Sequence, residues 1–177
     1  MIPLDKIDLR KQLRGQRKSC SPFFIRQASE RIMQKLLRYL EDKGCIGIYV
    51  SDGFEVDTHG IIEWCLKKGK RVAVPLVKEA FAMEFVEIAS FEDLAVGHYG
   101  LLEPVRGKCV EEADLECIII PMVGFNSQGY RIGQGGGYYD RYLKVYSGLK
   151  IGLAYRFQYC EFNEDKFDVA CDVILTE

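Results

Sequence analysis

Residues 117–143 read CIIIPMVGFNSQGYRIGQGGGYYDRYL, and this stretch decides the fold class. It opens with the most hydrophobic run of the chain, Cys117–Pro121, which predicts a central, fully buried strand. Five glycines follow within residues 129–137, directly before a helical pattern over Tyr138–Tyr146. A buried strand, a glycine-rich turn and a helix in this order are typical of an α/β protein.

The rest of the chain repeats this alternation of extended and helical patterns. A basic helix is expected over Lys6–Lys18, a second helix begins at Ser21-Pro22, and a third begins at Asp57-Thr58. Short apolar runs predict further strands at Cys45–Val50, Arg71–Leu76 with a break at Pro75, Ala82–Ile88, Ile151–Ala154 and Val173–Leu175. We therefore expect a layered α/β fold with a largely parallel central sheet flanked by helices, forming a single domain over residues 1–177.

The composition excludes several classes of protein. The chain carries 24 Lys and Arg against 26 Asp and Glu, for a formal net charge of −2, which argues against a general phosphate-backbone binder. No run approaches the roughly 18–20 apolar residues of a membrane span, and the first residues lack the apolar core of a signal peptide. Seven cysteines without a C-x-x-C pair, and only two histidines, argue against a disulfide framework and a zinc centre. We expect a cytoplasmic monomer that binds small molecules rather than nucleic acid or membranes.

The glycine-rich turn is the main candidate for a binding site. Glycine lets the backbone approach a ligand closely, and N–H groups before a helix suit phosphate oxygens. The turn is not a P-loop, which requires Gly-Lys followed by Ser or Thr, because Gly137 is followed by Tyr138. A dinucleotide fingerprint starting at Gly133 would also need glycine at position 138. The alternative to phosphate binding is a purely structural tight turn.

The run from Gly129 to Leu143 resembles the signature G-x-R-L-G-x-G-[GK]-G-Y-Y-D of the 5-formyltetrahydrofolate cyclo-ligase family. Ile132 replaces the usual Leu, and Asn126 stands where many members have Asp. Shorter motifs in the same order support the resemblance from end to end: Lys6-x-x-x-Arg10, Ser51-x-x-x-Glu55-Val-Asp57-Thr58, Gly97-x-Tyr99-Gly-x-x-Glu103-Pro104, Ala154-Tyr-x-Phe-Gln158 and Phe167-Asp168-x-x-x-Asp172.

The resemblance implies ATP-dependent closure of 5-formyltetrahydrofolate to 5,10-methenyltetrahydrofolate, with ATP as co-substrate and Mg²⁺ as cofactor. It implies charge neutralisation by two catalytic arginines, Arg10 and Arg131. ATP would be bound by Lys6, Ile7, Asp8, Leu9, Arg10, Arg131, Ile132, Gly133, Gln134, Gly135, Gly136, Gly137, Tyr138 and Tyr139. The folate would contact Arg10, Val50, Glu55, Tyr99, Gln134, Gly135, Gly136, Gly137 and Tyr138. The metal would be held by Asp140 and Asp168.

Each of these roles has a simpler alternative. The basic residues of the first helix could be a solvated face, which is how we interpret Arg14, Arg17 and Lys18. Glu55 could be a surface carboxylate, and Tyr99 could be a core tyrosine. Neither histidine is assigned to catalysis, and His98 has no evident partner. At the level of function, the alternatives are a nucleotide- or phosphometabolite-binding regulatory protein, or an isomerase or CoA-transferase-like enzyme of similar fold.

Overall fold

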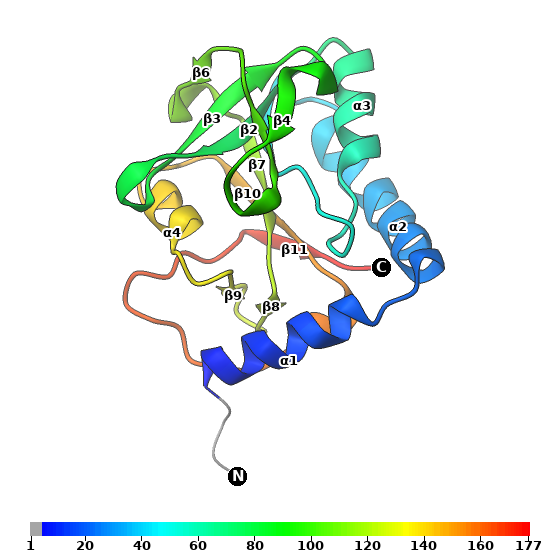
Figure 1. Cartoon of the computed structure of the whole chain (residues 1–177), viewed down its shortest axis with the longest axis vertical. Coiled ribbons are helices and arrows are strands. Elements are labelled where there is room, and N and C mark those ends of the chain that lie inside the picture. The colour runs from blue at the N-terminus through cyan, green and yellow to red at the C-terminus, as the bar shows by residue number, and fades with distance from the viewer. Residues whose placement is uncertain (1–4) are drawn as a thin grey trace.

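The computed structural model describes residues 5–177, and a seven-stranded sheet runs through its centre (Figure 1). The strand order is β11-β10-β7-β1-β2-β3-β6. Five neighbouring strands are parallel, and β3 and β6 join antiparallel at one edge, so the predicted, largely parallel sheet is confirmed. The strands are β1 (Cys45–Ile48), β2 (Arg71–Val77), β3 (Met83–Ile88), β6 (Cys109–Val110), β7 (Cys117–Pro121), β10 (Leu149–Leu153) and β11 (Val173–Leu175).

Four α-helices accompany the sheet: α1 (Lys6–Lys18), α2 (Pro22–Leu40), α3 (His59–Lys67) and α4 (Tyr138–Leu143). Asp5 caps α1 by accepting from two first-turn N–H groups, and the Ser21 hydroxyl caps α2 by accepting from Phe24 N–H at 3.1 Å. Both caps satisfy backbone donors that a helix start would otherwise leave unpaired. The start signal at Ser21-Pro22 therefore predicts the beginning of α2 correctly.

The side chains of β7 alternate between two hydrophobic cores. Cys117 and Ile119 face the core that α2 and α3 cover, while Ile118 and Ile120 face the core that α4 covers. All four are fully buried. A strand buried on both faces reads as a continuous apolar run, which is why residues 117–121 could be placed at the centre of the sheet.

Helix α1 belongs to neither layer. It lies across the end of the sheet where the parallel strands finish, next to the short hairpin of β8 (Gly124–Phe125) and β9 (Arg131–Ile132) (Figure 1). Leu9 and Leu13 pack there against Val123, Ile132 and Phe162 in a third, small core. A second hairpin is formed by β4 (Leu94–Val96) and β5 (Leu102–Pro104). Five 3₁₀ turns complete the described elements: Glu79–Phe81, Phe91–Asp93, His98–Gly100, Glu112–Asp114 and Arg156–Gln158.

Among the expected boundaries that differ from the structure, two have a clear physical reason. Pro75 does not break β2, which continues to Val77. β1 pairs with β2 only as far as Ala73, so the N–H that proline lacks costs no hydrogen bond to β1. The helix after the glycines ends at Leu143 rather than Tyr146. Tyr146 instead turns inward, and its hydroxyl donates to the Leu115 carbonyl at 2.9 Å.

None of the helices within residues 5–177 combines the length and the apolar character needed to cross a bilayer. All seven cysteines are free thiols.

Candidate active site

The candidate site lies at the carboxyl ends of β1 and β7. β1 sits between β2 on one side and β7 on the other, so the order of strands reverses at this point. Ligands of open α/β sheets bind outside the strand ends at such a switch point. The segments leaving the two strands, residues 49–58 and 122–137, contain Glu55 and the glycine-rich loop respectively.

Hydrogen bonds fix the backbone of the segment that carries Glu55. The Tyr155 hydroxyl donates to the Glu55 carbonyl at 2.7 Å, and the Tyr49 hydroxyl donates to the Val56 carbonyl at 2.9 Å. The segment is closed at its base because Ser51 N–H donates to the Thr58 hydroxyl at 3.0 Å. Glu55 is therefore held in place by its backbone, while its carboxylate makes only a local contact.

The Glu55 carboxylate occupies a partly buried position. Its Oε2 accepts from Asp52 N–H at 3.0 Å. Burial, assisted by the negative charge of Asp52, raises the pKa of Glu55 to about 7, against a weaker lowering by that hydrogen bond and by Arg17. Glu55 is thus neither fully exposed nor fully buried, and its role as a folate ligand stays a prediction. A carboxylate in this setting suits a ligand that brings its own N–H donors.

The glycine-rich loop depends on its glycines for its shape. Gly135 and Gly137 have φ values of +106° and +68°, in the left-handed region that other residues avoid. At Gly136 a Cβ atom would overlap the ring of Tyr138. Gly137 leads directly into α4, so the loop keeps its backbone open up to the first turn of the helix.

Three arginines of α1 approach this loop and the strand before it. Arg10 Nε donates to the Gly133 carbonyl at 2.7 Å, and Arg14 Nη2 donates to the Gln134 carbonyl at 3.3 Å. Arg17 Nη1 donates to the Met122 carbonyl at 3.3 Å. Within residues 5–177 none of the three forms an ion pair, so no carboxylate of that range neutralises their positive charges.

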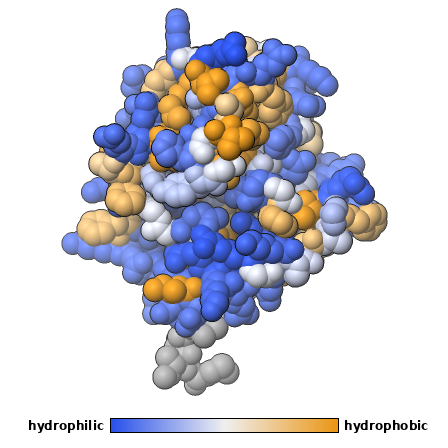
Figure 2. Space-filling view, viewed as in Figure 1, coloured by the Kyte–Doolittle hydropathy of each residue, from blue (hydrophilic) through white to orange (hydrophobic). Residues whose placement is uncertain are grey.

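The surface over α1 is strongly hydrophilic (Figure 2). A groove of about 500 Å³ runs there between α1 and Gln134, and its lining includes Arg10, Lys11, Arg14 and Lys18. Burial, together with the charges of Arg10 and Arg17, lowers the pKa of Arg14. Such mutual repulsion makes the groove a favourable place for an anion.

The other two predicted phosphate ligands are already paired. Lys6 Nζ contacts Asp165 at 2.7 Å and Asp168 at 2.5 Å. Arg131, whose side chain is 3% exposed, donates to Asp140 at 2.8 Å and to the Val169 carbonyl at 2.7 Å. Lys6 is therefore paired with two carboxylates and Arg131 with one.

The same contacts involve the two predicted metal ligands. Asp140 Oδ1 accepts from Arg131 and from Val169 N–H at 3.1 Å, and Asp168 Oδ2 accepts from Lys6. Each leaves its other oxygen without a hydrogen bond from residues 5–177. No cluster of three or more His, Cys, Asp or Glu side chains suited to a metal occurs in that range. Metal binding by this pair stays a prediction.

Exposed aromatic rings stand beside the glycine loop. Tyr99 is 78% exposed, which excludes the core alternative, and its hydroxyl lies 3.3 Å from that of Tyr138. Its backbone is left-handed at φ +57°, a strain that often marks functional positions. The ring of Phe81, whose centroid is 5.9 Å from that of Tyr138, was not singled out from the sequence.

Several smaller expectations can be compared with the structure. Val50 is buried directly after β1. Arg17 is buried rather than on the surface. His98 does have a partner, because its Nδ1 lies 2.9 Å from a Glu103 oxygen.

The structure also accounts for asparagine at position 126. Asn126 Oδ1 accepts from the N–H groups of Gln128 and Tyr130, and Nδ2 donates to the Phe162 carbonyl at 3.2 Å. An ionised aspartate could not make the last bond, because it has no donor. The spacing of residues in the sequence does not predict this contact between Asn126 and Phe162.

These features define an α/β protein with a cationic, glycine-rich site at the switch point of its sheet. The chain belongs to the 5-formyltetrahydrofolate cyclo-ligase family, whose model matches residues 4–177. The family resemblance inferred from the sequence is thereby confirmed, and the chain is an enzyme of this family.

Named relatives match nearly the whole chain. The 5-formyltetrahydrofolate cyclo-ligase of Mycoplasma genitalium is 32% identical, over 97% of this chain and 98% of its own length. The mouse protein of the same name is also 32% identical, over 85% of each chain. Among solved structures, the 5,10-methenyltetrahydrofolate synthetase of Mycoplasma pneumoniae has a TM-score of 0.83 at 30% identity, covering 98% of this chain and 99% of its own. The Aquifex aeolicus synthetase has a TM-score of 0.85 at 35% identity, covering 96% of this chain and 88% of its own.

Proposed function

We propose that the enzyme uses ATP to cyclise 5-formyltetrahydrofolate to 5,10-methenyltetrahydrofolate, releasing ADP and phosphate. The relatives' names support this substrate and product. The observation that carries the proposal is that a partly buried carboxylate and a glycine-rich loop lie at one switch point, where arginines that form no ion pair within residues 5–177 approach the loop. The carboxylate suits the amino and N–H donors of a pterin, and the loop suits a triphosphate.

The reaction needs activation of a poor electrophile. The formyl group on N5 is an amide, so its oxygen is a poor leaving group. Transfer of the γ-phosphoryl group to that oxygen forms an O–P bond as the bond to ADP breaks. The N10 amine then attacks the formyl carbon, and phosphate leaves with its bonding electrons. The enzyme has to position two anions and one carbonyl, which requires no nucleophilic side chain.

In this proposal the triphosphate binds over residues 131–139. Lys6 and Arg10 approach from α1, and Arg131 lies at the start of the loop. Arg10 is the better placed of the two predicted catalytic arginines, because Arg131 is held by Asp140 and the Val169 carbonyl. The folate binds beside Glu55 and Val50, with Tyr99 stacked on its ring.

The residues present fit a magnesium ion that arrives on the triphosphate. Mg²⁺ in such sites is bound by one or two carboxylates together with phosphate oxygens and water. Asp140 and Asp168 each have one oxygen left for this role. When bound, the ion would neutralise charge that develops on the transferred phosphoryl group.

The decisive experiment follows the absorbance of methenyltetrahydrofolate while purified enzyme is mixed with 5-formyltetrahydrofolate, with and without Mg-ATP. The proposal expects product only in the presence of ATP, with ADP formed in equal amount. Folate and nucleotide binding without product would instead favour the regulatory alternative. A cytoplasmic location and a monomeric state remain part of the proposal, and gel filtration tests the latter.

A further inference from the structure

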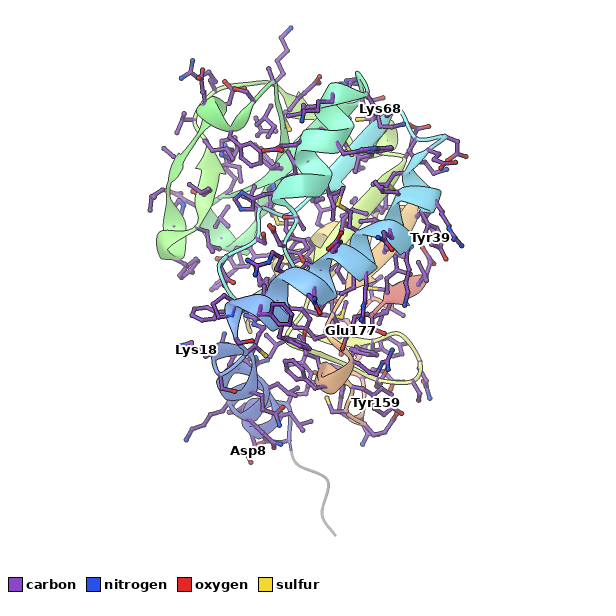
Figure 3. All side chains as sticks on the ribbon, turned by 90° about the vertical axis from the view of Figure 1, so that its right-hand side faces the viewer. Asp8, Lys18, Tyr39, Lys68, Tyr159 and Glu177 are labelled. Carbon is purple, nitrogen blue, oxygen red and sulfur yellow. The ribbon has the colours of Figure 1, made fainter. Side chains whose placement is uncertain are left out.

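Arg17 lies on the buried face of α1. Leu9, Leu13 and Arg17 are spaced four residues apart, so they share one side of the helix. The two leucines fill the small core below the β8–β9 hairpin. Arg17 is 5% exposed and sits one residue before Lys18, where α1 approaches α2 (Figure 3).

The guanidinium of Arg17 has far fewer partners than its burial would require. It has five N–H donors, yet residues 5–177 provide a single acceptor, the Met122 carbonyl at 3.3 Å. The buried Arg131 shows the contrasting case, with a carboxylate at 2.8 Å and a carbonyl at 2.7 Å. The other two guanidinium nitrogens, Nε and Nη2, make no hydrogen bond within residues 5–177 and are not among the fully buried unpaired atoms of that range, so they are open to an acceptor from a ligand.

Arg17 and Glu55 lie at the ends of the same two neighbouring strands. Met122 directly follows β7, and the Glu55 segment directly follows the neighbouring β1. Burial raises the pKa of three groups at these strand ends, and the positive charge of Arg17 opposes that rise in each, namely Tyr49, Glu55 and Tyr155. Arg17 and Glu55 nevertheless form no ion pair in residues 5–177.

A pterin ring offers a pattern that two such groups complement. Along one edge it presents a 2-amino group and an N3–H, which are donors, followed by a 4-carbonyl oxygen, which is an acceptor. A carboxylate can accept from the two donors, and a guanidinium can donate to the adjacent oxygen. Neither residue alone distinguishes this edge from a simpler amine or ketone.

We propose that Arg17 is a folate-binding residue whose guanidinium donates to the 4-carbonyl oxygen of the pterin while Glu55 binds the adjacent donors. This assignment rests on the proposed function. It places the third arginine of α1 on the folate half of the site, while Arg10 serves the nucleotide half. Specificity for the oxidised 4-position of the pterin then depends on Arg17.

The test uses Arg17→Met, Arg17→Lys and, as a matched control, Arg26→Met in the enzyme. Arg26→Met makes the same change at an exposed arginine of α2 that lines neither the groove nor the Glu55 segment. Calorimetry measures 5-formyltetrahydrofolate binding without ATP, and ATP binding is measured separately. Thermal unfolding is recorded for every variant, since a buried cation replaced by an apolar side chain of similar length should not lower stability.

The expected result for Arg17→Met is at least a tenfold loss of folate affinity, with ATP affinity within about twofold of the parent and the unfolding temperature unchanged or raised. Arg17→Lys should recover part of the loss, and Arg26→Met should bind folate normally. Unchanged folate affinity in folded Arg17→Met would overturn the inference, as would an equal loss for both ligands. If Arg17→Met fails to fold, Arg17→Lys decides the question. An Arg17→Lys variant with the folate affinity and the folate KM of the parent would contradict a specific hydrogen bond from the guanidinium of Arg17.

The test is also separable from the proposed function. Absence of turnover in a parent protein that still binds 5-formyltetrahydrofolate would reject the proposed function alone, and calorimetry with Arg17→Met would still decide the role of Arg17. Normal turnover in the parent, with Arg17→Met equally active and equally tight for folate, would reject only the role of Arg17.

Discussion

Arg131 and Asp140 form an ion pair of 2.8 Å that spans the glycine-rich loop. Arg131 belongs to the strand before the loop and Asp140 to the first turn of the helix after it, so the pair holds the two ends of the loop together. The carboxylate proposed to hold a metal is thus also a structural partner of a buried cation.

Asp140→Asn should therefore lower stability as well as activity. Removing the charge that faces Arg131, which is 3% exposed, should cost about 1–3 kcal/mol in the free energy of unfolding. Urea denaturation measures this, with Glu84→Gln as the control because Glu84 forms only an exposed pair with Lys78. Turnover should fall and recover in part at raised Mg²⁺. A destabilised variant with an unchanged Mg²⁺ titration would assign Asp140 to structure alone.

Glu55→Gln should weaken folate binding much more than ATP binding. The amide cannot accept charge-assisted hydrogen bonds from the pterin, a loss of about 1.5–3 kcal/mol. Calorimetry with each ligand separately distinguishes the two affinities. Glu63→Gln, the same change at an exposed glutamate of α3, is the control. Equal folate affinity for Glu55→Gln and the parent would remove Glu55 from the site.

The pH dependence of stability should also change in Glu55→Gln. Burial raises the pKa of Glu55 to about 7 from an ordinary value of 4.5, so between these values the folded state holds a proton that the unfolded state has released. Stability must then fall as the pH rises from about 4.5 to 7, and the buried group continues to destabilise the protein above that range. Glu55→Gln should unfold at a higher temperature than the parent at pH 8, with the difference vanishing near pH 4. An identical pair of profiles would contradict the raised pKa.

Gly136→Val should raise the KM for ATP or abolish turnover. The added side chain must displace the ring of Tyr138 and obstructs the approach of a phosphate to the backbone. Gly133→Ala provides a folding control, because a Cβ at Gly133 meets nothing within 4 Å, and its unfolding temperature should equal that of the parent. A folded Gly136→Val enzyme that saturates with ATP normally would move the nucleotide elsewhere.

Tyr99→Ala should raise the KM for folate by roughly two- to tenfold, because one stacking contact is lost. The KM for ATP should not change. Tyr99→Phe should keep most of the affinity, since the ring provides the contact. Tyr39→Ala on α2 is a control with another partly exposed tyrosine. If Tyr99→Ala and Tyr39→Ala behave alike, Tyr99 does not stack on the substrate.

The order of helices and strands was predictable because the apolar residues of most elements recur with the spacing of either a helix or a strand. The run over residues 117–121 is apolar throughout, and it is a central strand buried on both faces. The short hairpins β4–β5 and β8–β9 were missed, because two- and three-residue strands are too short for any period to register.

The position of the glycine-rich loop in the candidate site was predictable from the sequence, but the burial and the pairing of the site's cations were less so. Gly135 and Gly137 stand out because few other reasons place so many glycines before a helix. Arg17 was taken for surface because charge alone suggests a solvated face, and only its register with Leu9 and Leu13 indicated burial. The pairings of Lys6 with Asp168 and of Arg131 with Asp140 depend on how distant segments fold together, which no local pattern encodes.

Helix α1 is the first described element of the chain, yet Lys6 contacts Asp165 and Asp168 near the other end, and Arg131 contacts the Val169 carbonyl. During synthesis on the ribosome, α1 emerges long before either of these partners exists. The site can therefore be completed only after residues 165–169 have been made, and a polypeptide cut short before residue 165 would carry the glycine loop without these contacts. A fragment ending at β10 would also lack strand β11, so the last residues of the described chain complete both the sheet and the nucleotide side of the proposed site.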